Sequence, residues 1–162
     1  MTAESLKFIA DAMLGRLARW LRILGYDVVY NPSISDDDLI ARALNERRII
    51  LTMDKKLAER KSAENSLCIK SDDYREQLKQ VITYYNIDYK SYIFTRCLPC
   101  NKILEHIDKE KIQDKVPPYV YSTQDKFYFC KQCTRVYWSG THRNKILEKL
   151  NMMLKEINMK CV

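Results

Sequence analysis

LKFIADAMLGRLARWLRILG, residues 6–25, is the stretch that decides the expected fold. Its first five residues form a short apolar run, which stops at the carboxylate of Asp11. Apolar residues then recur with helical spacing, and Gly25 gives a stop signal. A strand, an acid and a helix in this order are typical of the first unit of an open parallel α/β sheet. Ligands of such sheets bind outside the carboxyl ends of the strands, which is where Asp11 falls.

Three more strand-and-helix units follow before residue 90. Strands are predicted at residues 27–30, 49–54 and 67–70. Helices are predicted to start at Ser35 or Asp36, at Lys55, and at the Asp72-Asp73 pair. This alternation predicts an α/β fold, an open parallel sheet with helices on both faces and right-handed crossovers.

The overall composition narrows the functional class. The 162 residues include 28 Lys+Arg and 21 Asp+Glu, a net charge of +7, which favours a polyanionic partner such as nucleic acid. A solvated Lys-rich surface is the alternative, and charge alone leaves it open. Neither glycine-rich phosphate motif occurs, so no nucleotide cofactor is expected. No apolar run could span a bilayer and no signal peptide is evident, so we expect a cytoplasmic protein without a membrane partner. The sequence does not indicate the oligomeric state.

The character of the chain changes after residue 90. Cysteine pairs and aromatic residues replace the helical spacing, which returns only in the tail. We therefore predict an α/β domain over residues 1–90, a zinc ribbon over 91–140, and a C-terminal helix over 141–162 that packs back on the α/β body. The apolar face of that helix consists of Ile146, Leu147, Leu150, Met153, Leu154 and Ile157.

Four cysteines form two C-x-x-C pairs, Cys97 with Cys100 and Cys130 with Cys133. Two residues between thiolates let both sulfurs of a pair reach one zinc ion, and two pairs complete a closed tetrahedral site. Two disulfides are the first alternative, disfavoured because there is no secretion signal. A redox-active pair is the second, but such a site needs only one pair beside a strand–helix start. The spacing predicts a structural zinc ribbon.

Carboxylates recur where the strands end. Asp11 and Asp54 follow strands, and Asp36 and Asp37 open the second helix. Converging carboxylates repel one another unless divalent cations neutralise them, and Mg²⁺ and Mn²⁺ prefer such oxygen ligands. Taken alone, the helix-opening acids are better explained by favourable interaction with the helix dipole. Thr52 is expected to hold the loop that carries Asp54.

A phosphate-receiving signalling domain is a rival α/β interpretation of these acids. It would need a second acid paired with Asp11 and a lysine after a fifth strand, and the sequence shows neither before the cysteines. Asp72 or Asp73 is a candidate fourth acid of a cation site, and no motif decides between them.

Several motifs in this order resemble the Mut-seven C-terminal RNase domain family, from about residue 6 to about residue 150. That family has a PIN-like nuclease fold carrying a zinc ribbon. The resemblance implies a metal-dependent nuclease whose acids are Asp11, Asp54 and the acid of the SDDDL motif, for which Asp36 is favoured and Asp37 is second. The matching segments are LKFIADAMLGRLARWLRILGYDV (6–28), SDDDL (35–39), RIILTMD (48–54), RCLPCN (96–101), CKQC (130–133) and VYWSGTH (136–142).

Basic residues supply a candidate grip on substrate. Arg16 and Arg19 on the first helix are predicted to line the approach to Asp11 and hold phosphates, whereas Arg22 is expected on a solvated helix face. Arg143 is one of several cations interleaved with aromatic residues in the ribbon, a pattern that suits single-stranded nucleic acid. His142 is predicted either to touch a phosphate or donate a proton, or simply to start the last helix.

Two functions follow from these patterns. The first is a Mg²⁺- or Mn²⁺-dependent ribonuclease, endonucleolytic, with a structural zinc ion and RNA as its partner. The second is a non-catalytic zinc-ribbon module that binds RNA within an RNA-processing assembly, whose acids hold no metal.

Overall fold

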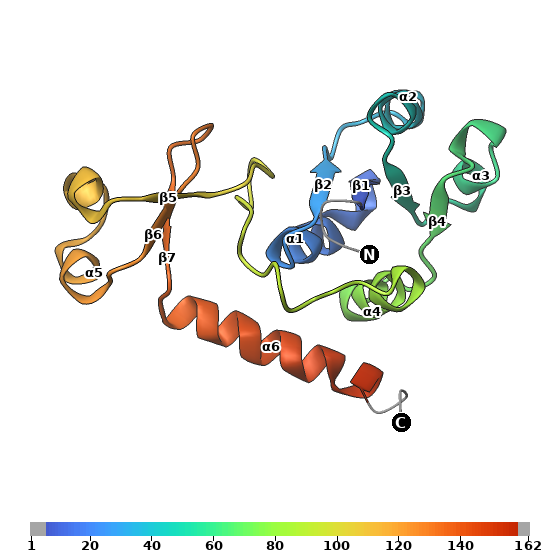
Figure 1. Cartoon of the computed structure of the whole chain (residues 1–162). Coiled ribbons are helices and arrows are strands. Elements are labelled where there is room, and N and C mark those ends of the chain that lie inside the picture. Colours follow the sequence, from blue (N-terminus) through green and yellow to red (C-terminus); the bar gives the residue numbers. More distant parts are fainter. Residues whose placement is uncertain (1–5, 159–162) are drawn as a thin grey trace. The chain divides into compact units, whose positions relative to one another are not determined.

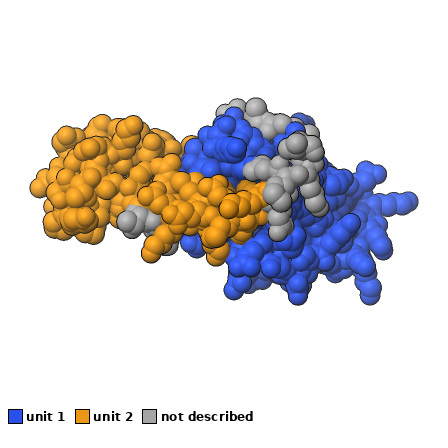
Figure 2. Space-filling view, turned by 90° about the horizontal axis from the view of Figure 1, so that it is seen from below, with its two compact units in different colours: residues 1–101 blue, residues 102–162 orange. Residues whose placement is uncertain are grey.

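The computed structural model describes residues 6–158, apart from the side chains of residues 141, 142 and 156–158. The chain divides into two compact units, Met1–Asn101 and Lys102–Val162 (Figure 2). The predicted zinc-ribbon segment, residues 91–140, therefore contributes residues to both units. Among the described residues, no helix combines the length and the apolar character needed to cross a membrane.

Unit 1 contains a four-stranded parallel sheet, which confirms the predicted α/β class (Figure 1). Its strands are β1 (Lys7–Ala10), β2 (Asp27–Tyr30), β3 (Ile49–Thr52) and β4 (Ser66–Cys68), in the spatial order β2-β1-β3-β4. β4 ends earlier than predicted because the backbone N–H of Lys70 donates to the side chain of Gln80 and not to a neighbouring strand.

Helical segments follow every strand, and side-chain caps fix where three of the helices begin. Ser35, Asp54 and Asp73 each accept backbone N–H groups of the helix that follows. The segments are η1 (Ala12–Leu14) and α1 (Gly15–Ile23), α2 (Asp36–Glu46), α3 (Lys55–Ala58) with η2 (Lys61–Ala63), and α4 (Tyr74–Tyr85).

The helices cover both faces of the sheet, as predicted (Figure 1). α1 and α4 contact each other on one face, where Phe8 of β1 lies edge-on to Tyr85 of α4. Successive strand residues point to opposite faces, so Ile9 faces the other side. There it packs with residues of β2, β3, α2, α3 and η2 in a buried cluster: Val29, Leu39, Ile40, Ala43, Ile50, Leu57 and Ala63.

The strand order reverses between β1 and β3, because β2 lies on one side of β1 and β3 and β4 lie on the other. In open α/β sheets, the crevice outside the strand ends at such a reversal is the usual ligand site. Asp11 directly follows β1, and Asp54 comes just after β3. The fold therefore places these two acids at the edge position where sheets of this kind bind ligands.

Unit 2 is built on a three-stranded antiparallel sheet with the order β5-β6-β7. Its small core consists of Ile112, Val116 and Phe127, against which the ribbon residues Tyr121 and Trp138 pack. The elements are β5 (Glu105–Ile107), η3 (Lys109–Lys115), α5 (Pro118–Thr123), β6 (Phe127–Phe129), β7 (Val136–Trp138) and α6 (Thr141–Asn158).

The C-terminal helix α6 is amphipathic, as its spacing predicts. Leu150, Met153 and Leu154 are buried, whereas Met152 is exposed. Ile157 belongs to the predicted apolar face, but its side chain lies outside the described residues. Packing of this face on the α/β body remains a prediction.

Candidate active site and metal centre

Asp11 is held at the end of β1 by hydrogen bonds of its backbone N–H and of its carboxylate. Its backbone N–H donates to the carbonyl of Leu51 on β3 at 3.0 Å. One carboxylate oxygen accepts the N–H of Ala12 at 2.6 Å, and the other accepts the hydroxyl of Thr52 at 2.8 Å. These bonds fix the orientation of the carboxylate, and the residue is only half-buried, so part of it reaches solvent.

Thr52 connects the two acids at the strand ends. Its hydroxyl donates to Asp11 and accepts the backbone N–H of Asp54 at 3.0 Å, and the side chain is fully buried. The expected role of Thr52 in holding the Asp54 loop is confirmed, and the bond to Asp11 adds a second partner. The Asp54 carboxylate in turn caps α3 by accepting the N–H groups of Lys56 at 2.7 Å and Leu57 at 3.3 Å.

Asp36 and Asp37 open α2 and share one cation. Arg60 donates to Asp37 at 2.9 Å and to Asp36 at 3.4 Å. The side chain of Asp36 is 46% exposed and that of Asp37 is 93% exposed. Exposed ion pairs of this kind contribute only about 0–1 kcal/mol, so the contact with Arg60 does not remove either carboxylate from use by another cation.

The acids and the cysteines are organised differently. Within the described part of the chain, the four cysteines are the one group of three or more His, Cys, Asp or Glu side chains whose ligand atoms all lie within 4.8 Å of one another. Asp11 and Asp54 are joined through the hydroxyl of Thr52, and Asp36 and Asp37 through Arg60. The acids are thus linked through other protein groups, whereas the sulfur atoms of the four cysteines lie directly beside one another.

The three arginines of α1 have different environments. Arg16 and Arg19 are exposed, and the guanidinium of Arg16 lies over the ring of Tyr74 at 5.7 Å. The expectation that Arg22 lies on a solvated face is wrong, since this residue is only 9% exposed. Its guanidinium is buried by the chain around residues 98–99, which it also holds by hydrogen bonds.

The two candidate contacts near the start of α6 are only partly defined. The side chain of His142 lies outside the described residues. Arg143 is half-buried and donates to the hydroxyl of Ser139, while its backbone N–H donates to the carbonyl of Gly140. A role of either residue in substrate binding stays a prediction.

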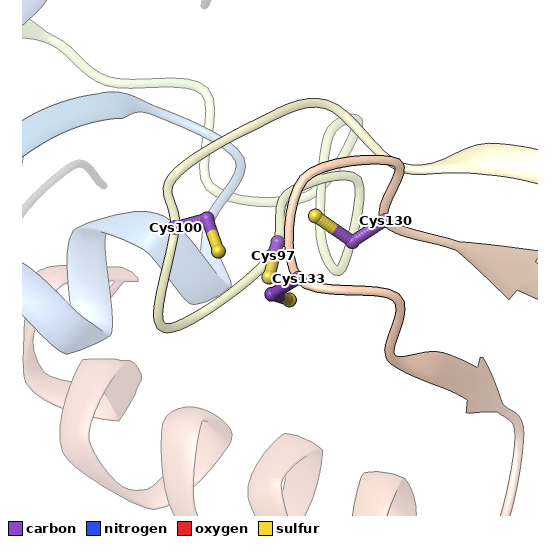
Figure 3. Close-up of side chains that lie close together, drawn as sticks. All are labelled: Cys97, Cys100, Cys130 and Cys133. Atoms are coloured by element: carbon purple, nitrogen blue, oxygen red, sulfur yellow. The ribbon is translucent and has the colours of Figure 1, made fainter.

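Cys97, Cys100, Cys130 and Cys133 form a compact group of thiols without a disulfide bond (Figure 3). Zinc bound to four thiolates at about 2.3 Å requires sulfurs about 3.8 Å apart, and side-chain adjustment from within 4.8 Å meets that requirement. The first cysteine of each pair is buried and the second is partly exposed. A closed set of four soft ligands fits a structural zinc ion, so this cluster could hold zinc.

The two C-x-x-C segments have the same backbone conformation. The residue after each pair, Asn101 or Thr134, has a positive φ of 63° or 56°. Its N–H donates at 2.8 Å to the carbonyl of the first cysteine, Cys97 or Cys130. We call residues 97–101 knuckle 1 and residues 130–134 knuckle 2. The repeated turn supports the interpretation that both pairs are metal knuckles.

Side chains of unit 1 that sequence reasoning missed hold knuckle 1 in place. Arg22 donates to the carbonyls of Leu98 at 2.6 Å and Pro99 at 3.1 Å, and also to the carbonyl of Val28. The side chain of Asn101 accepts the N–H of Val28 at 3.0 Å. Val28 lies on the edge strand β2, so both of its outward-facing backbone groups are satisfied by this network.

The network extends to a partly buried ion pair between Arg48 and Asp27 at the amino-terminal edge of the sheet. Asp27 accepts hydrogen bonds from Arg48 and from the side chain of Asn101, both on Oδ1. Burial alone would raise the pKa of Asp27, but these hydrogen bonds outweigh it and hold the pKa below its usual range. No local sequence pattern predicts these partners of Asp27, because Arg48 and Asn101 are far from it in the sequence.

The sheet, the acids at its strand-order reversal and the four-thiol cluster together define an α/β protein with a candidate zinc site. Residues 6–150 match the Mut7-C RNAse domain, and the chain belongs to that family. Membership supports a nuclease, a hydrolase whose substrate is RNA, as the resemblance of the motifs predicts. No curated protein and no solved structure matches the chain.

Proposed function

We propose that this chain is a Mg²⁺- or Mn²⁺-dependent ribonuclease that hydrolyses RNA phosphodiesters endonucleolytically. Asp11, Asp54 and Asp36 hold the ions, with Asp37 as the second choice on α2. The observation that carries the proposal is the pairing of Asp11 and Asp54 at the ends of adjacent parallel strands, tied together by the buried hydroxyl of Thr52.

Bound divalent ions supply such a site with an activated water and with charge stabilisation for the leaving oxygen. The protein itself orients the carboxylates that would hold these ions. Asp11 is fixed by Ala12 and Thr52, so its carboxylate does not need to be ordered when a cation binds. Asp54 is exposed and anchored through its α3 cap, which lets it reach solvent from a defined position.

Basic residues of both units are the proposed contacts with the RNA backbone. Arg16 and Arg19 are exposed on α1, which begins shortly after Asp11, and are proposed to hold RNA phosphates. His142 and Arg143 are proposed contacts from the start of α6. The net charge of +7 supports RNA as the partner, and a zinc-bound ribbon would orient it.

A non-catalytic RNA-binding module is the second candidate. It is favoured by one observation: each candidate acid already has a protein partner, either Arg60 or a backbone or hydroxyl donor. In this case the zinc-bound ribbon and the basic surface would bind RNA, and the acids would serve only as helix caps and ion-pair partners.

Cleavage of a labelled RNA with added Mg²⁺ or Mn²⁺ tests the proposal. We expect Asp11→Asn and Asp54→Asn each to lower the cleavage rate by more than about 100-fold, the scale seen when one preorganised electrostatic group is removed. Asp88→Asn is the matched control for Asp54→Asn. Asp88 also accepts the N–H groups two and three residues on, from Lys90 and Ser91, but it follows α4 at the opposite edge of the sheet.

The outcomes separate the two candidates. Cleavage by Asp54→Asn at the wild-type rate would refute the proposed site. Absence of Mn²⁺ binding to the wild-type protein in calorimetric titration, with RNA affinity retained, would establish the non-catalytic module. A covalently closed circular RNA tests the mode of action, because only an endonuclease can open it.

A further inference from the structure

Tyr74, the first residue of α4, holds two guanidinium groups. The guanidinium carbon of Arg16 lies 5.7 Å from the centre of the Tyr74 ring, and that of Arg75 lies 5.5 Å from it. Trp20 of α1 stacks on the same ring, with the planes at 9° and the centroids 6.4 Å apart. The ring is therefore backed by a buried side chain of α1 and carries a cation from each of the two helices.

This group lies on the same edge of the sheet as Asp11. α1 follows β1 and α4 follows β4, so both helices begin where the parallel strands end. Arg16 lies in the first turn of α1, shortly after Asp11, and Tyr74 directly follows the capping residue Asp73. The contact between α1 and α4 brings the two cations together from distant parts of the sequence.

Both guanidinium groups remain available to a ligand. Arg16 and Arg75 are exposed, and neither forms an ion pair among the residues that the structure describes. The nearby acids have other partners: Asp73 accepts the backbone N–H of Arg75, and Glu76 pairs with Lys79.

We propose that Arg16 and Arg75, positioned by Tyr74, form a phosphate subsite for the RNA backbone beside the cleavage position. The guanidinium of Arg16 uses its face for the contact with the ring, and the guanidinium of Arg75 also forms a side-chain hydrogen bond with Tyr74. A guanidinium has five N–H donors, so each group keeps N–H groups on its edge for phosphate oxygens. Holding the side chains in advance also lowers the conformational entropy lost on binding. The proposal rests on the proposed function, because it takes RNA as the ligand.

The test is the salt dependence of RNA binding, measured by fluorescence anisotropy with a short single-stranded RNA and the full chain in the Asp54→Asn background. One phosphate contact to a single strand contributes about 0.7 to the slope of log K against log salt. We expect Arg75→Gln and Arg16→Gln each to weaken binding about tenfold at low salt and to lower the slope by about 0.7.

Two further variants separate positioning from charge and from packing. Tyr74→Leu keeps both charges but removes the ring, so we expect weaker binding. Tyr74→Phe keeps the ring but loses the side-chain hydrogen bond to Arg75, so we expect it to restore binding in part. Arg42→Gln on α2 is the control, since it removes one exposed charge that is already paired with Glu46. Thermal unfolding of Arg75→Gln at the wild-type temperature would show that the loss of affinity does not come from unfolding.

Each outcome has a defined meaning. Equal slopes for Arg75→Gln and Arg42→Gln, or equal affinities for Tyr74→Leu and Tyr74→Phe, would overturn the subsite while leaving cleavage at the aspartates intact. Normal RNA binding with the expected slope changes, but no metal-dependent cleavage, would support the subsite and refute the nuclease proposal. No binding of RNA by the wild-type protein would overturn both.

Discussion

Knuckle 1 and knuckle 2 share one backbone turn but are held in place by different means. In both, the first cysteine is buried, the second is partly exposed, and a residue with positive φ donates its N–H to the first cysteine carbonyl. The carbonyls of Leu98 and Pro99 in knuckle 1 accept hydrogen bonds from the buried Arg22. In knuckle 2, Lys131 and Gln132 occupy the corresponding positions and are exposed.

The second knuckle depends on its own hairpin. It connects β6 to β7, and the N–H of Cys130 donates to the carbonyl of Arg135 across the turn. Its Lys131 forms an ion pair with Glu105, which is exposed and therefore weak. The comparison teaches that identical C-x-x-C turns differ in what supports them: knuckle 1 is a fixed part of unit 1, whereas the geometry of knuckle 2 comes from a three-stranded sheet and from any metal it holds.

Among the substitutions that test this difference, Arg22→Ala should have the largest effect on stability. The substitution leaves the carbonyls of Val28, Leu98 and Pro99 without their buried donor, at about 1–3 kcal/mol for each group that water does not reach. We expect the free energy of unfolding of unit 1 to fall by about 3 kcal/mol. Urea unfolding in a Trp138→Phe background measures this, because the remaining tryptophan, Trp20, then reports on unit 1 alone.

Two variants make the Arg22 prediction decisive. Arg19→Ala removes the same side chain from an exposed position on the same helix, and we expect it to change stability by less than about 0.5 kcal/mol. Arg22→Lys retains the charge but lacks the forked donor, so its loss should be intermediate. Equal stabilities of Arg22→Ala and Arg19→Ala would show that knuckle 1 does not rely on this residue.

The sequence predicted the sheet, because each strand carries its own evidence. The apolar runs, the capping residues Ser35 and Asp73, and the stop at Gly25 are local features that the structure confirms. Gly25 adopts φ 91°, and a Cβ there would collide with the carbonyl of Tyr92, so this position requires glycine. The C-x-x-C spacing of each knuckle was likewise enough to predict that the four cysteines form one group.

The environment of Arg22 could not be predicted in the same way. Helical spacing places Arg16, Arg19 and Arg22 in one row and says nothing about what covers that row. Burial of Arg22 depends on a chain segment more than seventy residues later. Tyr74 and Arg75 were missed for the same reason, since their contact with Arg16 depends on the packing of α4 against α1.

Asn101→Gly should have the next largest effect on the stability of unit 1. Glycine accepts the positive φ at this position, so the knuckle turn itself is kept. The variant loses the side-chain bonds to the Val28 N–H and to Asp27, at 3.0 Å and 2.7 Å, and we expect unit 1 to lose about 2 kcal/mol of stability near neutral pH. Urea unfolding followed by Trp20 fluorescence measures the change.

The pH dependence of the Asn101→Gly deficit gives a second measurement. The folded-state pKa of Asp27 is lowered, so its contribution to stability is present above the pKa of the unfolded carboxyl, about 3.9, and is lost as the pH falls through the folded value. Without Asn101 the folded-state pKa of Asp27 rises toward its unfolded value, so protonation of Asp27 removes less stability from the variant than from the wild-type protein. The deficit should therefore shrink below about pH 4, and a deficit independent of pH would show that Asn101 does not act on Asp27.

Thr134→Gly, the same change at the equivalent position of knuckle 2, should have the smallest effect and the opposite sign. A β-branched residue at φ 56° is strained by about 1–2 kcal/mol, and glycine relieves that strain at an entropic cost of about 0.4–1 kcal/mol. The side chain of Thr134 contributes only an exposed hydrogen bond to the carbonyl of Cys133. We expect knuckle 2 to gain about 0.5 kcal/mol, seen as slower hydrogen exchange of the residue 134 amide, which donates to Cys130. Faster exchange in this variant, alongside the loss in Asn101→Gly, would mean that the Thr134 side chain also anchors its knuckle and that the two turns are supported alike.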